Sequence, residues 1–88
     1  MEIIWDEEKN NKLFFDRGIR FEDIAEIIIN NKYIDIIENP TRDNQLYFVI
    51  NLNNYIHIVP FVVDTNNTIV LKTIFPSKKY NNLYRGKK

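Results

Sequence analysis

The hydrophobic pattern of this chain changes once, near residue 33, and that change restricts the fold more than any other feature of the sequence. After that point β-branched and aromatic residues come in runs, which is typical of strands. The runs predict four strands, at about 33–38, 45–51, 55–63 and 68–75. Short polar connections separate the later runs and favour hairpins. The second part of the chain therefore predicts an antiparallel meander.

The first third has helical signals instead. Asp6 can accept hydrogen bonds from the free N–H groups at a helix start, and Gly18 suits a left-handed helix end. We expect this first helix to turn Leu13 and Phe14 inward. Trp5, just before it, is expected to pack the N-terminal segment against the core.

A second helix is predicted at about 21–31, because its apolar residues fall on one face. They are Phe21, Ile24, Ala25 and Ile28. Two N-terminal helices followed by a four-stranded antiparallel sheet make an α+β domain. A short basic C-terminal tail, 76–88, would form either a short helix or a loose extension.

The sequence leaves the register of the first predicted hairpin open. A two-residue turn at 53–54 pairs Leu52 with Tyr55, whereas a three-residue loop pairs Asn51 with Tyr55. A slip of one residue changes the face on which His57 lies.

The second predicted hairpin has the connection 64–67. Loops of two or four residues both place Val59 and Phe61 on the same face as Val70 and Lys72.

The 88-residue chain contains no cysteine and one histidine, which excludes several kinds of site. Disulfides, a thiolate zinc site, a cysteine nucleophile and an all-histidine metal triad are all ruled out. The length predicts a single domain, 1–88. No run approaches the roughly 18 apolar residues of a membrane span, and the acidic start lacks the features of a signal peptide. We therefore expect a cytoplasmic protein without a membrane partner.

The formal net charge of zero conceals a strong asymmetry. Residues 1–43 hold eleven acidic and six basic side chains, whereas residues 44–88 hold one acid and six bases. Those six bases are Lys72, Lys78, Lys79, Arg85, Lys87 and Lys88. Such segregation indicates a basic tail that meets a polyanion, and Tyr80 and Tyr84 lie among the bases, where they could stack on unpaired nucleobases. A merely solvated C-terminus explains the same charges.

Two segments of the N-terminal third resemble the opening of the BrnT family. They are Trp5-Asp6-Glu7-Glu8-Lys9-Asn10 and Gly18-Ile19-Arg20-Phe21-Glu22-Asp23. In that family a W-D-x-x-K-N start and an H-G-[VI]-x-F-E-E motif each precede a helix. The likeness continues in order to the basic Pro76-Ser77-Lys78-Lys79 segment, although the family's histidine is replaced by Arg17.

The resemblance implies a type II toxin with a RelE-like fold. Such a toxin is a small ribonuclease that cleaves RNA without a metal ion or other cofactor and is held inactive by a cognate antitoxin. By position, Lys72, Lys78 and Lys79 correspond to basic residues of the family. Two alternatives stay open: a noncatalytic module that binds RNA or protein, and a nuclease-dead relative on the same fold.

Metal-independent cleavage of RNA requires an activated 2′-OH, a stabilised phosphate charge and a proton for the leaving oxygen. The candidate catalytic residues are Lys72 and Lys78, for the phosphate, and His57, because histidine is the side chain that titrates near neutral pH. Candidate RNA contacts are Arg17, Lys79, Tyr80, Tyr84 and Arg85.

Each candidate also has a plainer structural explanation. Lys72 could be an exposed-face lysine that discourages edge pairing, and His57 a hydrogen-bonded strand residue. Tyr47 could stack a base, donate a proton or lie half-buried in the sheet. Glu38 and Arg42 are expected to form a surface ion pair. The acidic residues at 6–8 lack the spacing of a metal site, so we predict none.

Overall fold

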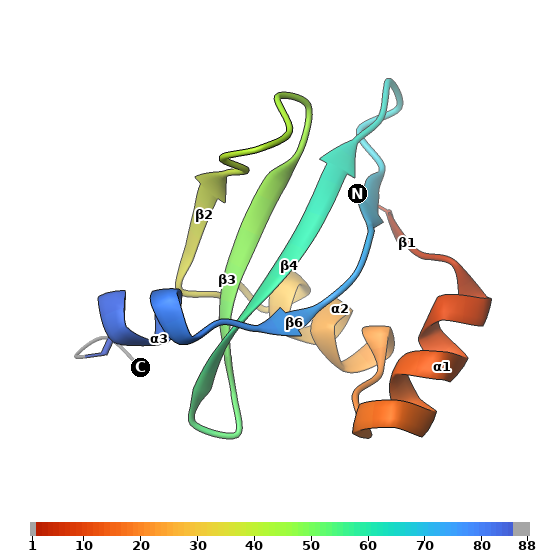
Figure 1. The fold of residues 1–88 in the computed structure, drawn as a ribbon. Coiled ribbons are helices and arrows are strands. Elements are labelled where there is room, and N and C mark those ends of the chain that lie inside the picture. The colour runs from red at the N-terminus through yellow and green to blue at the C-terminus, as the bar shows by residue number, and fades with distance from the viewer. Residues whose placement is uncertain (1, 86–88) are drawn as a thin grey trace.

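Six strands form one mixed sheet in the computed structural model, which describes residues 2–85 (Figure 1). The strands are β1 (Ile3–Ile4), β2 (Asp35–Glu38), β3 (Leu46–Leu52), β4 (Tyr55–Val63), β5 (Ile69–Leu71) and β6 (Phe75–Pro76). Their order is β1-β5-β4-β3-β2, and β6 also pairs with β4. The α+β class and the antiparallel meander from β2 to β5 are confirmed.

The sheet also differs from the predicted four antiparallel strands. β1 pairs in parallel with β5, and the last predicted run, 68–75, is divided between β5 and β6. A two-residue strand has no visible alternation, so the hydrophobic pattern does not reveal β1.

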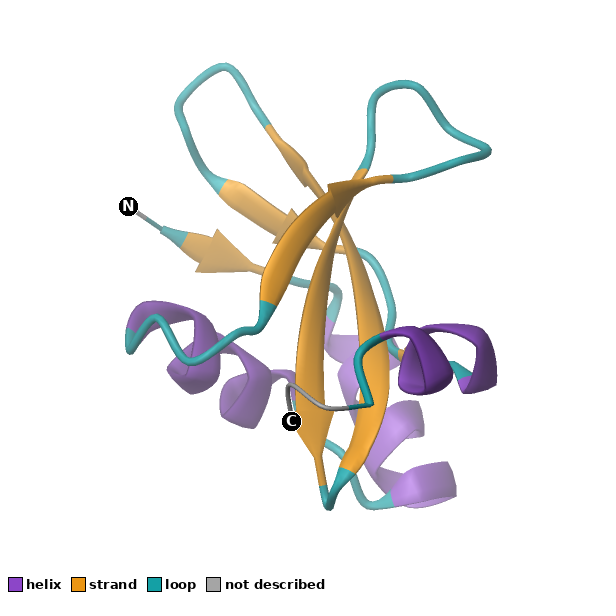
Figure 2. Cartoon of the chain, turned by 90° about the vertical axis from the view of Figure 1, so that its left-hand side faces the viewer, coloured by secondary structure: helices purple, strands orange, loops and turns teal. Residues whose placement is uncertain are grey.

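Within residues 2–85, three helices flank the sheet. α1 (Glu7–Arg17) and α2 (Phe21–Ile29) precede β2, and α3 (Lys78–Leu83) follows β6. α2 and α3 lie on opposite sides of the sheet (Figure 2). We call these two sides the α2 face and the α3 face. Of the two predictions for the tail, the short helix is confirmed over 78–83.

Each face of the sheet has its own core. The larger core, on the α2 face, includes Phe21, Ile24 and Ile28 of the predicted apolar stripe. The smaller core, on the α3 face, contains Tyr47, Val49, Ile56, Ile58 and Tyr84. A sheet with both faces covered buries most of β3 and β4, which explains their nearly continuous apolar sequences.

α1 has the predicted ends. Asp6 Oδ1 accepts hydrogen bonds from the backbone N–H groups of Glu8 and Lys9, at 2.9 and 3.4 Å. Gly18 ends the helix with a φ of 68°, in the left-handed region that glycine adopts without strain.

The inward face of α1 is narrower than predicted. Leu13 packs against the core, and Trp5 lies beside Phe21 with 5.9 Å between the ring centroids, as expected. Phe14, however, is 46% exposed and lies beneath the Arg20 guanidinium, 4.0 Å from the ring centroid. The prediction that Phe14 is buried is wrong, because α1 lies at the margin of the sheet (Figure 1).

The buried residue of α1 is polar. Asn10 is only 4% exposed, and its Oδ1 accepts a hydrogen bond of 2.7 Å from the backbone N–H of Phe21, the first residue of α2. Arg20 precedes α2 without a side-chain cap, so Asn10 caps the second helix from the first. Asn10 Nδ2 donates to the carboxylates of Glu7 and Glu22, and the bond to Glu22 is the largest cause that lowers the pKa of that carboxyl.

The first hairpin has the two-residue turn. Both turn residues, at 53–54, have positive φ angles, of 53° and 65°, which matches the twist of an antiparallel pair. Leu52 therefore pairs with Tyr55, and His57 lies opposite Ile50 on the α2 face.

The second hairpin has the opposite parity to the one predicted. Phe61 pairs with Leu71, so Val59 and Phe61 share the α2 face with Leu71 rather than with Val70 and Lys72. The connection 64–68 has five residues, and an odd number inverts the alternation of the following strand. The Asp64 carboxylate stabilises this longer loop by accepting hydrogen bonds from the N–H groups of residues 66 and 68.

A β-bulge separates β5 from β6. Three residues, 72–74, oppose two residues of β4, 59–60, so the extra residue lies in the segment between β5 and β6. Pro60 has no N–H for this ladder, and only its carbonyl is used, accepting from the Lys72 N–H at 2.9 Å. The bulge thus lies where the ladder lacks a donor, which is where a sheet tolerates proline. It also lets Ile74 return to the α2-face core.

Candidate functional site

A row of three residues crosses the α3 face beside the bulge. Tyr47 of β3 pairs with Pro60 of β4, and the Pro60 carbonyl is bonded to the N–H of Lys72. Residues directly opposite one another in neighbouring strands project from the same face. Adjacent strands are about 4.8 Å apart, so Tyr47 and Lys72 stand about 10 Å apart with the short Pro60 ring as a floor between them.

A groove of about 470 Å³ opens over this row. We call it the basic groove; its lining is Lys9, Asn39, Thr41, Arg42, Gln45, Tyr47, Pro60, Lys72, Thr73 and Phe75. Among these described residues are three cations, two side-chain amides, two threonine hydroxyls and two aromatic rings, but no carboxylate. The volume is in the range of small-ligand sites, large enough for one nucleotide unit.

The cations of the basic groove lack carboxylate partners. Within residues 2–85, neither Lys9, Arg42 nor Lys72 forms an ion pair. Lys9 Nζ instead donates to the backbone carbonyl of Lys72, at 3.4 Å. The predicted ion pair between Glu38 and Arg42 is therefore not formed in this part of the chain. Uncompensated charges in a concave site attract anions.

A second hollow, of about 240 Å³, continues the basic groove along α1. Lys9 and Thr73 line both hollows, and Lys12 and Arg17 line the second together with the carboxylate of Asp16.

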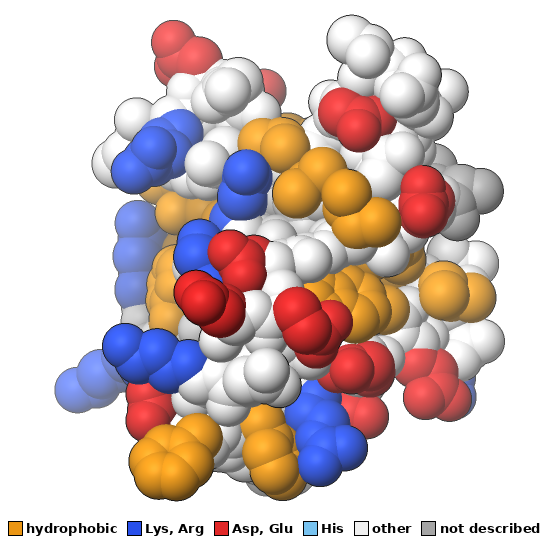
Figure 3. Space-filling view, turned by 90° about the vertical axis from the view of Figure 1, so that its right-hand side faces the viewer, with side chains coloured by type: hydrophobic (Ala, Val, Ile, Leu, Met, Phe, Trp, Pro, Cys, Tyr) orange, Lys and Arg blue, Asp and Glu red, His pale blue; other side chains and the backbone are white. Residues whose placement is uncertain are grey.

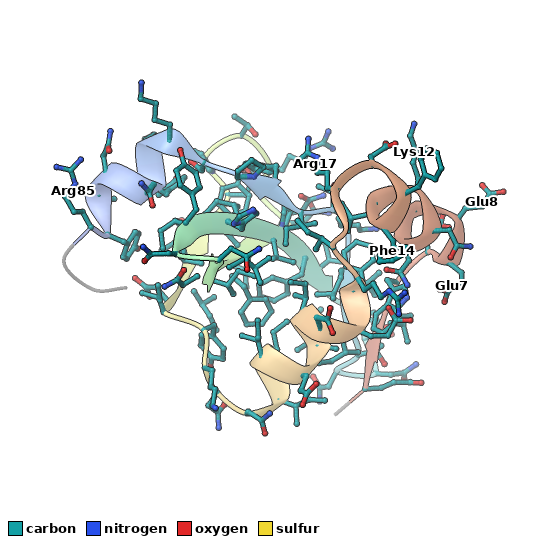
Figure 4. The ribbon with its side chains drawn as sticks, turned by 90° about the horizontal axis from the view of Figure 1, so that it is seen from below. Glu7, Glu8, Lys12, Phe14, Arg17 and Arg85 are labelled. Carbon is teal, nitrogen blue, oxygen red and sulfur yellow. The ribbon has the colours of Figure 1, made fainter. Side chains whose placement is uncertain are left out.

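Five basic residues thus follow one path, which we call the cationic track. They are Arg17, Lys12, Lys9, Lys72 and Arg42. Lys12 and Arg17 project from α1 toward the side that carries β6, whereas Glu7 and Glu8 point away from it (Figure 4). In Figure 3 the Lys and Arg side chains gather along the left-hand margin, and many acidic side chains lie to their right. Four of the five residues of the track come from the acidic first half of the sequence, so the fold, and not the charge asymmetry along the chain, gathers these cations.

Tyr47 brings a hydroxyl group to the basic groove. Its ring lies edge-on to those of Phe75 and Tyr80, with 6.3 Å between centroids in both pairs. Within the described residues, the Tyr47 hydroxyl forms no hydrogen bond. The hydroxyl is therefore not engaged by another side chain or backbone group of the described residues.

The structure does not bring His57 to Lys72, one of the two lysines predicted to act with it. His57 is 8% exposed on the α2 face, and its Nδ1 lies 3.0 Å from the carbonyl oxygen of Tyr55. Lys72 is opposite Pro60 on the α3 face. The sheet therefore separates the imidazole from Lys72, and the hydrogen-bonded structural explanation fits His57.

Tyr84 is a core residue rather than a surface for stacking. It is buried on the α3 face, and its hydroxyl donates a hydrogen bond of 2.8 Å to Asp35. Burial, then this hydrogen bond, raises the pKa of Tyr84. Arg85 donates a hydrogen bond to Asn82 and lies at the far end of α3 from the rest of the molecule, well apart from Arg17 (Figure 4). Lys87 and Lys88 lie outside the described residues.

The other predicted residues of the tail lie on α3. Lys78 and Lys79 are exposed, and Lys79 Nζ is 5.3 Å from the Tyr80 ring centroid. Tyr80 contacts Tyr47, so this pair borders the aromatic wall of the basic groove. Of the predicted catalytic and RNA-contacting residues, the structure places Lys72 in the groove, Arg17 in the adjoining hollow, and Lys79 and Tyr80 beside its wall.

Sequence reasoning missed Lys9, Arg42 and Gln45 as groove residues. They come from α1 and from the loop between β2 and β3, which are remote from Lys72 in sequence. The signal that could have found Arg42 is its place beside a proline-containing polar loop, since such loops carry binding residues more often than strands do.

No group of three or more His, Cys, Asp or Glu side chains among residues 2–85 is arranged to hold a metal ion. In the same part of the chain, none of the helices has the length and apolar character needed to cross a membrane. Comparison with protein-family models, with curated proteins and with solved structures finds no match to this chain.

Proposed function

We propose that this chain is a metal-independent endoribonuclease, the BrnT-like, RelE-like toxin of a type II toxin–antitoxin pair, which acts on RNA in the cytoplasm. The observation that carries the proposal is the basic groove. Its described lining has three cations that form no ion pair within residues 2–85, two aromatic rings and no carboxylate. RNA offers the matching chemistry, because its phosphates need cations and its unpaired bases stack on rings.

In the proposed reaction, the 2′-oxygen attacks the adjacent phosphorus, the bond to the 5′-oxygen breaks, and a 2′,3′-cyclic phosphate forms. Lys72 and Arg42 would stabilise the charge that develops on the phosphate, because both cations line the groove without a competing acid. The Tyr47 hydroxyl would give its proton to the leaving 5′-oxygen. The tyrosinate would then take a proton from water, which restores the hydroxyl. The proton of the 2′-OH passes to solvent or to a basic group of the site.

Controlled expression in bacteria without any antitoxin tests this proposal. We expect growth arrest and RNA breakdown from the wild-type chain, and loss of both when Lys72→Ala is combined with Arg42→Ala. Lys32→Ala is the matched control, because Lys32 lines a hollow with Asp23 and Glu26, away from the groove. Normal growth and intact RNA at high levels of folded wild-type protein would refute the proposal.

One observation favours a second candidate, an RNA-binding protein that does not cleave. The described lining of the basic groove has no imidazole and no carboxylate, so Tyr47 is its main proton-transfer group besides the lysines. Purified Tyr47→Phe protein separates the two functions when it is incubated with RNA in the presence of a chelator. A toxin is expected to lose most cleavage and keep its affinity, whereas a noncatalytic binder shows no cleavage with either protein.

A cognate antitoxin would have to neutralise the same positive surface. Its contact segment is therefore expected to be acidic and to compete with RNA for the basic groove. The product of a neighbouring small reading frame can be tested by co-purification with the wild-type chain and with the Lys72→Glu variant. An affinity for the antitoxin that changes neither with salt concentration nor in the Lys72→Glu variant would contradict an electrostatic mode of neutralisation.

A further inference from the structure

The basic groove also contains a side-chain amide held in one orientation. We infer that Gln45 selects the nucleobase by its substituent at purine C6 or pyrimidine C4. The groove would then prefer guanine and uracil, which carry an oxygen at that position, over adenine and cytosine, which carry an amino group there. This inference rests on the proposed binding of RNA in the groove.

The loop that carries Gln45 is closed by hydrogen bonds of its own backbone. The Asn39 N–H donates to the Gln45 carbonyl, and the Gln45 N–H donates to the Arg42 carbonyl, both at 3.2 Å. Gln45 is half-buried immediately before β3, two residues from Tyr47. Its side chain therefore starts from fixed backbone rather than from a free loop tip.

A chain of hydrogen bonds determines which end of the Gln45 amide faces the ligand. The backbone N–H of Thr41 can only donate, and it donates to the Asn39 side chain at 2.9 Å, so that acceptor must be Oδ1. Asn39 Nδ2 therefore faces Gln45 and donates a hydrogen bond of 3.2 Å to Gln45 Oε1. The Thr41 hydroxyl adds a second bond to Asn39 Oδ1, at 3.0 Å.

The consequence is that Gln45 Nε2 is the end left for a ligand. Within the described residues it donates no hydrogen bond, although Gln45 lines the groove. An amide nitrogen carries two donors and no acceptor. Turning the amide over would place two NH₂ groups, those of Asn39 and Gln45, against each other, so the orientation is held before a ligand arrives.

Two fixed donors distinguish the bases by one group. Guanine has an oxygen at C6 and uracil at C4, and both oxygens accept hydrogen bonds. Adenine and cytosine have an NH₂ group at the same positions, which would confront the Gln45 donors with another donor. A buried or half-buried mismatch of this kind leaves polar groups unpaired, which makes hydrogen-bond readout selective.

The remainder of the groove suits one base of this kind. Tyr47 and Phe75 line it beside Gln45, and an aromatic ring stacks on any base without preference. Arg42 and Lys72 lie in the same lining and would hold the flanking phosphates. In this arrangement the cations and rings bind RNA in general, and Gln45 supplies the sequence preference.

Binding to four matched oligonucleotides tests the inference. Each has six sugars, five of them abasic, with one guanine, uracil, adenine or cytosine, and 2′-O-methyl groups that block cleavage. Fluorescence anisotropy of the wild-type protein is expected to give about tenfold tighter binding for the guanine and uracil oligonucleotides than for the other two.

The decisive variant is Gln45→Glu. The carboxylate still accepts from Asn39 but replaces the two donors with an acceptor, so the preference for uracil over cytosine is expected to reverse. Asn44→Asp is the matched control: it adds the same charge to the next residue of the loop, which is exposed and not part of the groove lining. This variant is expected to bind all four more weakly and to keep the preference for guanine and uracil.

The possible outcomes separate this inference from the proposed function. Equal wild-type affinity for all four oligonucleotides, or the same order of preference in Gln45→Glu and Asn44→Asp, would overturn base selection by Gln45 while the groove remained an RNA site. Absence of any binding, with an unchanged circular dichroism spectrum, would instead overturn the proposed function and the inference with it.

Discussion

The salt dependence of RNA binding gives the most direct test of the cationic track. Each phosphate contact to a single strand contributes a slope of about −0.7 to the logarithm of affinity against the logarithm of salt concentration. The basic groove is lined by three cations, so RNA confined to it is expected to give a slope of about −2.1. Affinity would then fall about 20-fold between 50 and 200 mM salt.

Removing the Lys72 charge should change this slope by a defined amount. Lys72→Met keeps most of the aliphatic stem and leaves two cations in the groove, so the slope should become about −1.4. The affinity of this variant should then fall only about sevenfold between 50 and 200 mM salt. Lys32→Met, which removes a charge beside Asp23 and Glu26, should leave the slope unchanged.

The same titration reports how far the RNA extends. If the RNA also follows α1 past Lys12 and Arg17, five cations contribute and the wild-type slope should approach about −3.5. The assay is fluorescence anisotropy of a single-stranded RNA at several potassium chloride concentrations, with chelator present. A slope near zero, or one that Lys72→Met and Lys32→Met alter equally, would refute the assignment of this surface to RNA.

Three further predictions concern stability, each measured by urea unfolding. Asn10→Ala leaves the first N–H of α2 without its acceptor and should cost about 1–3 kcal/mol, whereas Asn11→Ala, at an exposed neighbour, should cost far less. Tyr84→Phe should cost about 1 kcal/mol near neutral pH. The pKa of Tyr84 is raised in the folded state, so the unfolded chain loses that proton first as the pH rises. Wild-type stability should therefore fall above about pH 10, and the fall should be smaller for Tyr84→Phe. Asn53→Ala should cost about 1 kcal/mol because its φ is 53°, while Asn53→Gly should cost less; equal effects would contradict the backbone explanation.

Several elements of the fold could be predicted because their causes are local. Asp6 and Gly18 set the ends of α1 through hydrogen bonds and backbone angles within one turn. The apolar spacing of α2 predicted the residues that it buries. The short Asn-Asn connection indicated a hairpin, and the positive φ angles of both asparagines explain why the two-residue turn is the one that forms.

The candidate site could be predicted only in part. Lys72 was expected because a lysine within the predicted strand 68–75 has to project from one face of a sheet, although in the structure Lys72 follows β5 and lies in the bulge. Its face was predicted relative to the wrong neighbours, because a five-residue loop inverts the alternation that two or four residues preserve. His57 drew attention as the one imidazole, but chemical type alone does not tell on which side of the sheet a side chain lies.

The sequence by itself therefore determined the local structure, the α+β class and the separation of charge along the chain. Only the tertiary structure decided that Lys9, Arg42, Gln45 and Tyr47 meet Lys72 around Pro60. The reason is that this meeting depends on strand pairing and on a bulge opposite a proline, and a shift of one residue in either would turn the same side chains to the other face of the sheet. Helix ends and turns are set by neighbours along the chain, whereas the groove is set by residues that only the sheet brings together.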